Sequence, residues 1–313
     1  MILVTGGLGF IGQHVTRALL DHGETCVVTQ YRAKRPPSLF KNEIGSRVLV
    51  EPMDVTDTAG FVSLGRKYKI DGIVHLAGGF SPQGPFEDIR ANMVGLANAL
   101  QAAHEWQVRR ILVASALGVY SGVTQIPWRE DQPLAFAASS PIEAFKKAGE
   151  IFSSYTANFL HLDCITMRIA AVYGPLYDST RGGLVGRLVH AAVNGTKPSL
   201  ENIRWPIYAQ DGADQCYVKD TARAIALLTV ADKLHHQTYN VASGRPTTNH
   251  QVVDAIQQVI PEAEIELPRA PNPSPVPYQD ITWLNEDTGF GPQFTTESGI
   301  ADYIAWLRAG NAM

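Results

Sequence analysis

The first twelve residues place the strongest constraint on the fold of this chain. Ile2 to Thr5 is an apolar, strand-like run, and Gly6, Gly9 and Gly12 follow it with the spacing G-x-x-G-x-x-G. A helical pattern of apolar residues then continues to about His22. A strand, a glycine-rich turn and a helix N-terminus in this order form the phosphate-binding part of a dinucleotide site. The alternative, a purely structural glycine turn, does not require the strand and the helix that flank this one.

Each glycine of the turn has a separate task in such a site. Gly6 permits the tight turn, Gly9 lets a pyrophosphate approach the backbone, and Gly12 lets the helix pack closely on the strand. Phe10 and Ile11 lie between the last two glycines. We therefore expect all five residues to contribute to cofactor binding.

Composition and charge limit the classes of partner. The chain has 313 residues, of which 45% are hydrophobic and 18% charged, as expected for one large or two coupled domains with a full core. The net charge of -4 and the pI near 6.1 provide no basic surface for nucleic acid or an anionic membrane. We expect a small-molecule substrate, no nucleic acid and no membrane. Because Met1 directly precedes the first strand, we expect no leader and a cytoplasmic protein.

The three cysteines do not indicate a metal site or a disulfide framework. Cys26, Cys164 and Cys216 are odd in number and far apart, and the first two lie in apolar strand-like runs. This distribution is typical of buried free thiols. We expect no metal and no catalytic cysteine.

Strand-like and helical patterns alternate through the first half of the chain. The strand-like runs are Ile2 to Thr5, Thr25 to Thr29, Arg47 to Glu51, Gly72 to Leu76, Arg110 to Ser115 and Cys164 to Arg168. This alternation predicts an α/β fold with a doubly wound parallel sheet of the Rossmann type. We expect residues 1–172 to form the dinucleotide-binding domain. Residues 173–313 would form mostly a small substrate-binding lobe, with about 214–243 returning to the first domain.

Several ordered motifs extend over nearly the whole chain. They are Thr5 to Gly12, Asp54-Val55, Val74 to Ala77, Asn92, Ser115 with Val119-Tyr120, Lys146, Arg168 with Tyr173 to Pro175, Tyr217 to Asp220, Tyr239 to Val241 with Gly244, and Gly289-Phe290. With these motifs the chain resembles the extended short-chain dehydrogenase/reductase family. That group comprises NAD(P)-dependent sugar epimerases, dehydratases and reductases.

The resemblance implies roles for several residues. Asp54 and Val55 would border the adenine, Leu76 and Ala77 would line the ribose and nicotinamide side, and Lys146 would hold the nicotinamide ribose. Each residue also has a structural alternative. The apolar residues would be ordinary core in any such sheet, and Asp54 could cap a turn with the residues that follow it.

The end of the second strand bears on the choice of cofactor. NAD-preferring members carry an acid there, which accepts hydrogen bonds from the ribose 2′-hydroxyl. Gln30 occupies that position, and Arg32, Lys34 and Arg35 follow it. Because a guanidinium matches phosphate oxygens, we expect NADP to be preferred over NAD, with Arg32 as the phosphate partner. The alternative is a solvated basic cluster on the surface.

The chain departs from the family pattern at the proton relay. The family places a tyrosine four residues before the lysine and a serine or threonine at the end of the fifth strand. Here Ile142 stands four residues before Lys146, and Ala116 occupies the hydroxyl position. Ser115 precedes it by one residue and should point to the other side of the strand. Both groups of the usual acid/base pair are missing.

The positions that would bind a nucleotide sugar also differ. Leu117 and Gly118 stand where the dehydratases carry an Asp-Glu pair, so we expect no 4,6-dehydration. Ala213 stands where an arginine grips the substrate diphosphate, and Arg269 lacks the usual residues after it. We expect nucleotide sugars to be poor ligands, with Arg269 equally consistent with a solvated loop charge.

Replacement proton donors must come from the rim above the nicotinamide. The candidates are Ser81, Glu87, Glu143, Tyr173, Tyr177, Tyr208 and Asp211, of which Glu87, Tyr173 and Asp211 are retained as weak catalytic candidates beside Lys146. Tyr173 also fits a packing role, and Glu143 fits a solvated charge on a helix. His75 lies on a predicted buried strand and is interpreted as a core histidine.

Three functions remain open at this point. The first is an NAD(P)-dependent oxidoreductase or epimerase-like enzyme that acts on a small hydroxylated or carbonyl substrate with a non-standard proton donor. The second is a cofactor-binding sensor or scaffold without redox turnover, and the third is non-redox isomerase or lyase chemistry. The resemblance also implies a homodimer through the helices of Asn92 and Lys146, to which Ile151 and Phe152 could contribute.

Overall fold

The computed structural model describes residues 1–31, 35–79, 85–178, 183–200, 203 and 206–311. Its centre is a parallel sheet of seven strands in the order β10-β6-β5-β4-β1-β2-β3. These strands are β1 (Ile2–Thr5), β2 (Cys26–Gln30), β3 (Val48–Pro52), β4 (Gly72–His75), β5 (Arg110–Ala116), β6 (Cys164–Ile169) and β10 (Thr238–Val241). The predicted α/β, doubly wound parallel sheet is confirmed, and each strand predicted from the sequence begins and ends within one residue of its observed limits.

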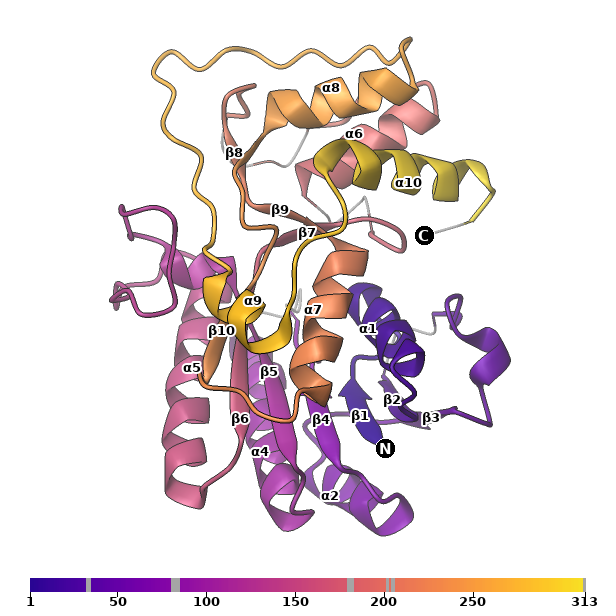
Figure 1. The fold of residues 1–313 in the computed structure, drawn as a ribbon, viewed down its shortest axis with the longest axis vertical. Coiled ribbons are helices and arrows are strands. Elements are labelled where there is room, and N and C mark those ends of the chain that lie inside the picture. Colours follow the sequence, from indigo (N-terminus) through magenta and orange to yellow (C-terminus); the bar gives the residue numbers. More distant parts are fainter. Residues whose placement is uncertain (32–34, 80–84, 179–182, 201–202, 204–205, 312–313) are drawn as a thin grey trace.

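Helices cover both faces of the sheet (Figure 1). On one face lie α1 (Phe10–Asp21) and α7 (Val218–Val230), and on the other lie α2 (Thr58–Lys67), α4 (Gly95–Glu105) and α5 (Pro141–Leu160). Burial on both faces explains why the strands are almost continuously apolar in sequence. Shorter elements in this half are α3 (Pro85–Ile89), a π-helical turn (Arg90–Val94) and two 3₁₀ turns (Lys41–Glu43 and Leu117–Tyr120).

The remaining helices form a smaller lobe beyond the carboxyl edge of the sheet (Figure 1). Its core lies between α6 (Leu184–Val193), α8 (Asn249–Val259) and α10 (Thr296–Arg308). Two small sheets connect it to the rest of the chain. They pair β7 (Ala171–Tyr173) with β9 (Gln215–Tyr217) and β8 (Gly212–Ala213) with β11 (Thr247–Thr248), and α9 (Thr282–Thr288) follows the long segment after α8.

Helix α5 is the element that carries the predicted catalytic positions, and local sequence signals define where it begins. Ser140 is its N-cap and accepts a hydrogen bond from the backbone N–H of Glu143. Pro141 occupies the first turn, where its missing N–H costs nothing. The helix then continues for 20 residues and packs along β5 and β6.

Candidate functional site

The glycine-rich turn connects β1 to α1 at the carboxyl edge of the sheet. Gly6 has a positive φ of 68°, and a β-carbon on Gly12 would lie 2.2 Å from the carbonyl oxygen of Gly6. Gly9 is the N-cap of α1, and no described side chain caps the helix there. The first N–H groups of this helix therefore face the turn, as an anion-binding helix N-terminus requires.

Hydrogen bonds connect the ends of β1, β2 and β4 around this turn. The hydroxyl of Thr29 accepts from the N–H of Gly6 at 3.0 Å, and the hydroxyl of Thr5 accepts from the N–H of Ala77 at 3.1 Å. His75 is 4% exposed and bonds to the Thr5 hydroxyl through Nδ1 at 2.9 Å. The interpretation of His75 as a core histidine is confirmed, and Leu76 and Ala77 follow it at the edge.

The predicted cofactor-selecting segment lies next to the turn. Gln30 is the last residue of β2, whereas Arg32 and Lys34 fall outside the described residues. Gln13, which sequence analysis did not single out, is 1% exposed and donates from Nε2 to the carbonyl oxygens of Leu8 and Pro36. It thus joins the segment after Gln30 to the glycine turn. The sequence offered one signal for this role, because Gln13 is a polar residue on an otherwise apolar face of the helix.

Asp54 and Val55 follow β3 at the same edge. The Asp54 carboxylate accepts from both the N–H and the hydroxyl of Thr56, at 2.9 and 2.8 Å, which is the turn-capping role given as the alternative. Val55 lies against Gly95, where an added β-carbon would be 2.8 Å from its Cγ2. A role of either residue at an adenine stays a prediction.

Helix α5 brings Lys146 and Ile142 to the end of β5. The ammonium of Lys146 donates to the carbonyl oxygen of Ala114 at 2.7 Å, and burial lowers its pKa to about 8. Ile142 is 38% exposed and lies one helical turn earlier, with its Cγ2 about 3.8 Å from the position of a β-carbon on Gly118. The side chains at Ile142 and Ala116 offer no proton at this edge.

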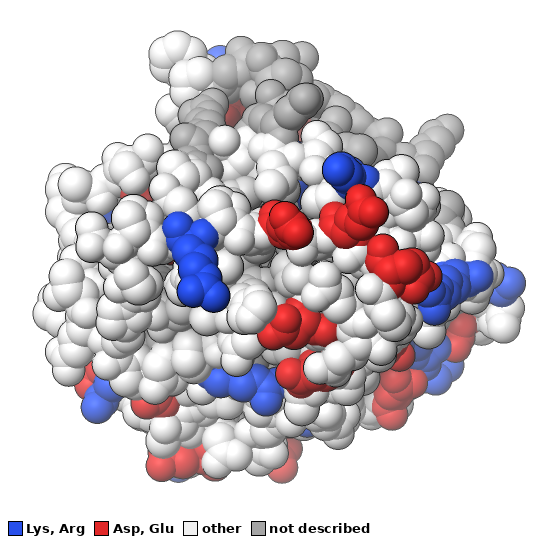
Figure 2. Space-filling model, turned by 90° about the horizontal axis from the view of Figure 1, so that it is seen from above, with Lys and Arg blue, Asp and Glu red and all other residues white. Residues whose placement is uncertain are grey.

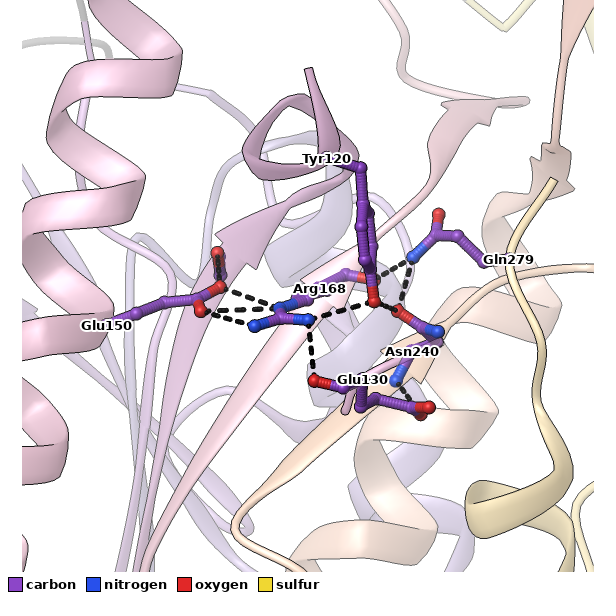
Figure 3. A network of polar contacts seen from close by, with 7 residues as sticks. Tyr120, Glu130, Glu150, Arg168, Asn240 and Gln279 are labelled. Carbon is purple, nitrogen blue, oxygen red and sulfur yellow. Dashed lines mark hydrogen bonds and ion pairs between the residues drawn. The ribbon is translucent and has the colours of Figure 1, made fainter. Parts of the chain in front are cut away.

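The hydroxyl of Ser115 is bound to helix α5. Its Oγ donates to a carboxylate oxygen of Glu150 at 2.5 Å, one turn beyond Lys146 on α5. The same carboxylate pairs with the guanidinium of Arg168 from β6, with Nη2 to Oε2 at 2.8 Å (Figure 3). The Glu150 carboxylate is thus held by both Ser115 and Arg168. The i, i+4 spacing from Lys146 could have identified it in the sequence.

Arg168 is also the centre of a wider polar network that Figure 3 displays. It donates to the hydroxyl of Tyr120 and to the carbonyl oxygen of Glu130, and the Tyr120 hydroxyl in turn donates to the Asn240 side chain. The Glu130 carboxylate accepts from the N–H of Asn240, and burial raises its pKa to about 7. Segments far apart in sequence meet here, so Glu130 had no local signal.

The weak candidates for proton transfer have other partners. Glu87 pairs with Arg90 on the surface, and the Asp211 carboxylate accepts from the N–H of Tyr208 at 3.3 Å, in the segment that leads into β8. Tyr173 is 2% exposed and packs against Tyr217, and burial raises its pKa. Its predicted packing role is confirmed.

Glu143 requires a correction. It was predicted to be a solvated charge, but it is 8% exposed and accepts from the N–H and hydroxyl of Ser139, at 2.7 and 3.1 Å. These bonds lower its pKa. The prediction was wrong because the chain turns back over the first turn of α5 and covers this side chain.

The positions predicted to bear on the substrate are separated. Leu117 and Gly118 form the 3₁₀ turn after β5, Ala213 pairs with Thr247 between the two small strands, and Arg269 is exposed in the long segment after α8. Within the described ranges, no cluster of three His, Cys, Asp or Glu residues could hold a metal ion. The three cysteines are buried free thiols, as predicted.

On the face seen in Figure 2, the described Lys and Arg side chains lie apart from one another, with acidic side chains between and beside them. No helix formed by the described residues is long and apolar enough to cross a bilayer.

Comparison with known proteins identifies the family. The NAD dependent epimerase/dehydratase family matches residues 2–242. The chain belongs to this family. The family's cofactor is NAD, and the preference for NADP predicted from Gln30 and Arg32 is not supported by this match.

Relatives within the family cover nearly the whole chain. A UDP-glucose 4-epimerase of Mycolicibacterium smegmatis is 28% identical over 98% of this chain and 98% of the relative. Among solved structures, the UDP-glucose 4-epimerase of Thermotoga maritima with UDP-glucose has a TM-score of 0.83 at 23% identity, and covers 99% of both chains. The Thermus thermophilus UDP-glucose 4-epimerase complex with NAD has a TM-score of 0.77 at 25% identity, with 99% of both chains covered.

Proposed function

We propose that this protein binds a nicotinamide dinucleotide at the carboxyl edge of its sheet and exchanges a hydride with a small hydroxylated or carbonyl substrate, using a proton donor other than tyrosine. The observation that carries the proposal is the pairing of a retained Lys146, hydrogen-bonded at the end of β5, with Ile142 and Ala116 in place of the tyrosine and hydroxyl. The lysine is preserved where the family uses it to hold a cofactor.

The described residues fit the cofactor. The turn is formed by Gly6, Gly9 and Gly12, and a β-carbon at Gly12 would collide with its backbone. The turn presents the N-terminus of α1, where a pyrophosphate would bind. Asp54, Val55, Leu76 and Ala77 lie after the neighbouring strands and would line the adenine, ribose and nicotinamide, with Phe10, Ile11, Gln30 and Lys146 completing the site. We propose that residues 1–172 and about 214–243 form this half and that the remaining C-terminal residues form the substrate lobe.

The preference between the two cofactors is a separate proposal. Gln30 carries no negative charge to repel a 2′-phosphate, and Arg32 offers a guanidinium close to it in sequence. We therefore propose NADP(H) as the preferred form. The complexes of relatives with NAD support the dinucleotide but not this preference.

A second candidate function is cofactor binding without redox turnover, as in a sensor or scaffold. It is favoured by the engagement of the three alternative donors, Glu87, Tyr173 and Asp211, in other contacts. Turnover separates the two functions. Calorimetry with NADH and NADPH, followed by a screen of sugars and aldehydes with the tighter cofactor, supports the first function if any substrate is reduced and the second if binding occurs without reduction.

We also propose a homodimer through α4 and α5. The outer face of α5 exposes Ile151, Phe152, Tyr155 and Phe159, and Tyr155 stacks on Phe159 at a centroid distance of 6.0 Å. A groove of about 420 Å³ lies between this face and α4. Two-fold packing would bury these side chains. Light scattering at micromolar concentration should give twice the chain mass, and a monomer would exclude the proposal.

A further inference from the structure

We propose that Lys146 is the group that exchanges a proton with the substrate oxygen, and that the carboxylate of Glu150, itself held by Ser115 and Arg168, is the nearby charge that tunes this exchange. The inference rests on the proposed function, because a proton must accompany the hydride. It goes further by assigning the proton to a side chain whose expected task is to hold the cofactor.

Lys146 lies close to the two apolar positions in both α5 and β5. Its Nζ reaches the backbone of Ala114 on β5, one helical turn after Ile142 and two residues before Ala116. An ammonium has three N–H groups, and among the described residues one of them is used, by the Ala114 carbonyl oxygen. The others remain for ligands. Lys146 is thus a titratable side chain one helical turn from Ile142 and bound two residues from Ala116.

The charges around Lys146 make proton exchange possible near neutral pH. Burial lowers the pKa of its ammonium to about 8, and the Glu150 carboxylate opposes that shift. From β4, His75 faces it as a neutral ring, since burial lowers the pKa of His75 to about 3. From β6, Arg168 acts through its ion pair with Glu150. An acid/base group is most effective when its pKa lies near the working pH.

A small cavity connects Lys146 to these partners. Its volume is about 20 Å³, and its polar lining includes His75, Asn92, Ser115, Lys146, Glu150 and Thr166. That volume suits one water molecule with several polar neighbours. In this proposal, a water molecule in the cavity returns a proton to Nζ after each transfer.

In the reducing direction, a bound reduced nicotinamide would supply a hydride to the carbonyl carbon and be left oxidised, while Nζ of Lys146 gives its proton to the carbonyl oxygen, so that a hydroxyl forms. Lys146 is left as a neutral amine, which takes a proton back through the cavity. In the oxidising direction, the neutral amine accepts the hydroxyl proton.

The alternative is that Lys146 does no more than hold the cofactor ribose. Lys146→Arg separates the two roles, because arginine still donates hydrogen bonds but does not lose its proton in proteins. Lys147→Arg is the matched control, since Nζ of Lys147 donates to the carbonyl oxygen of Ala137 instead. We expect the control to behave as wild type.

The first test needs neither cofactor nor substrate. In protein labelled with ¹³C at lysine Cε, the resonance lost in Lys146→Arg should titrate with a midpoint near pH 8 in wild type. Glu150→Gln should lower that midpoint by about one unit, because it removes an opposite charge and leaves Arg168 unpaired nearby. A midpoint above pH 10 in wild type would overturn the inference whether or not the Glu150 variant folds.

The second test uses the cofactor alone. At pH 8, binding of NADP⁺ brings a positive ring toward Lys146 and should release part of a proton, whereas NADPH should release less. Calorimetry in buffers of different ionisation enthalpy measures this proton release. The Lys146→Arg variant should bind NADP⁺ with an affinity within about fivefold of wild type but release no proton. Binding without proton release overturns the inference alone. Absence of binding by either cofactor overturns the proposed function, and the lysine titration still decides the protonation of Lys146.

Discussion

The two sides of the candidate site differ in how they depend on side chains. On the turn side, Gly6, Gly9 and Gly12 present backbone N–H groups, and the threonine bonds at Thr5 and Thr29 hold the strand ends around them. On the wall formed by β5 and α5, chemistry depends on side chains. On this wall, Ile142 and Ala116 are apolar at the positions that we assign to the family's tyrosine and hydroxyl.

Under the proposed function, binding and proton transfer would change independently in one fold. A dinucleotide site built from backbone is preserved whenever the turn is preserved. Under the proposed assignment, Ile142 and Ala116 stand at the positions of the relay, and both sit at the surface of the wall, where an apolar side chain costs the fold little. The network below the wall, from Ser115 through Glu150 to Arg168, remains complete.

Placing a tyrosine and a hydroxyl on this wall should produce the largest effect, a gain in reductase activity. Ile142→Tyr combined with Ala116→Ser supplies the missing phenol and hydroxyl beside Lys146, and general acid/base help contributes about 10² to 10⁴-fold. We expect reductase activity with NADPH on simple aldehydes to rise by at least about 100-fold over wild type. Steady-state absorbance at 340 nm measures it, with Ile142→Phe plus Ala116→Ser as the control. Fast wild-type turnover that collapses in Asp211→Asn, Glu87→Gln or Tyr173→Phe would instead place the relay elsewhere.

The network below the wall should make stability depend on pH. Burial raises the pKa of Glu130 to about 7, so the folded state binds its proton more tightly than the unfolded state. Its stabilising contribution is complete below the unfolded pKa near 4.5 and is lost as the pH rises through 7. Asp280 acts in the same direction and Arg168 opposes it.

Glu130→Gln should therefore be more stable than wild type at pH 8 by about 1 to 3 kcal/mol and nearly equal to it at pH 4.5. Urea unfolding at the two pH values measures this difference. A variant that is less stable than wild type at pH 8 would mean that the folded state favours the charged form of Glu130, with the Arg168 guanidinium outweighing the effect of burial.

On the turn side, the cofactor preference should respond to one guanidinium. Arg32→Ala should weaken the affinity for NADPH by about tenfold, which corresponds to about 1.4 kcal/mol, and leave the affinity for NADH within about twofold of wild type. Calorimetry on wild type and Arg32→Ala with both cofactors measures these affinities, and Arg35→Ala is the matched control. Equal affinity of wild type for both cofactors would exclude the preference for NADP.

The smallest effect is expected for nucleotide sugars. Ala213 cannot neutralise a diphosphate, and charge brought into a site without a partner is costly. UDP-glucose and dTDP-glucose should therefore raise the melting temperature of cofactor-saturated protein by less than about 1 °C. A rise of several degrees with either sugar would restore a nucleotide-sugar substrate, as the names of the relatives suggest.

Sequence patterns predicted the sheet well because its signals are local. Continuous apolar runs identify β1 to β6, and the glycine spacing identifies the turn. The same patterns misjudged Glu143, because the covering contact comes from the chain that folds back at Ser139. They also missed Glu130, whose partner Asn240 lies 110 residues away. Long-range polar contacts leave no periodicity in a sequence, so a site that depends on them requires the structure.

The central claim is that the protein binds the cofactor although the wall of β5 and α5 carries no tyrosine at position 142. One calorimetric titration tests this claim directly. NADPH and NADH are titrated into wild type and into Ile142→Tyr plus Ala116→Ser. The account predicts saturable binding of the preferred cofactor to both proteins with dissociation constants within about threefold, because the turn and Lys146 are unchanged. No binding to wild type, or binding that arises only when the tyrosine is restored, would contradict it.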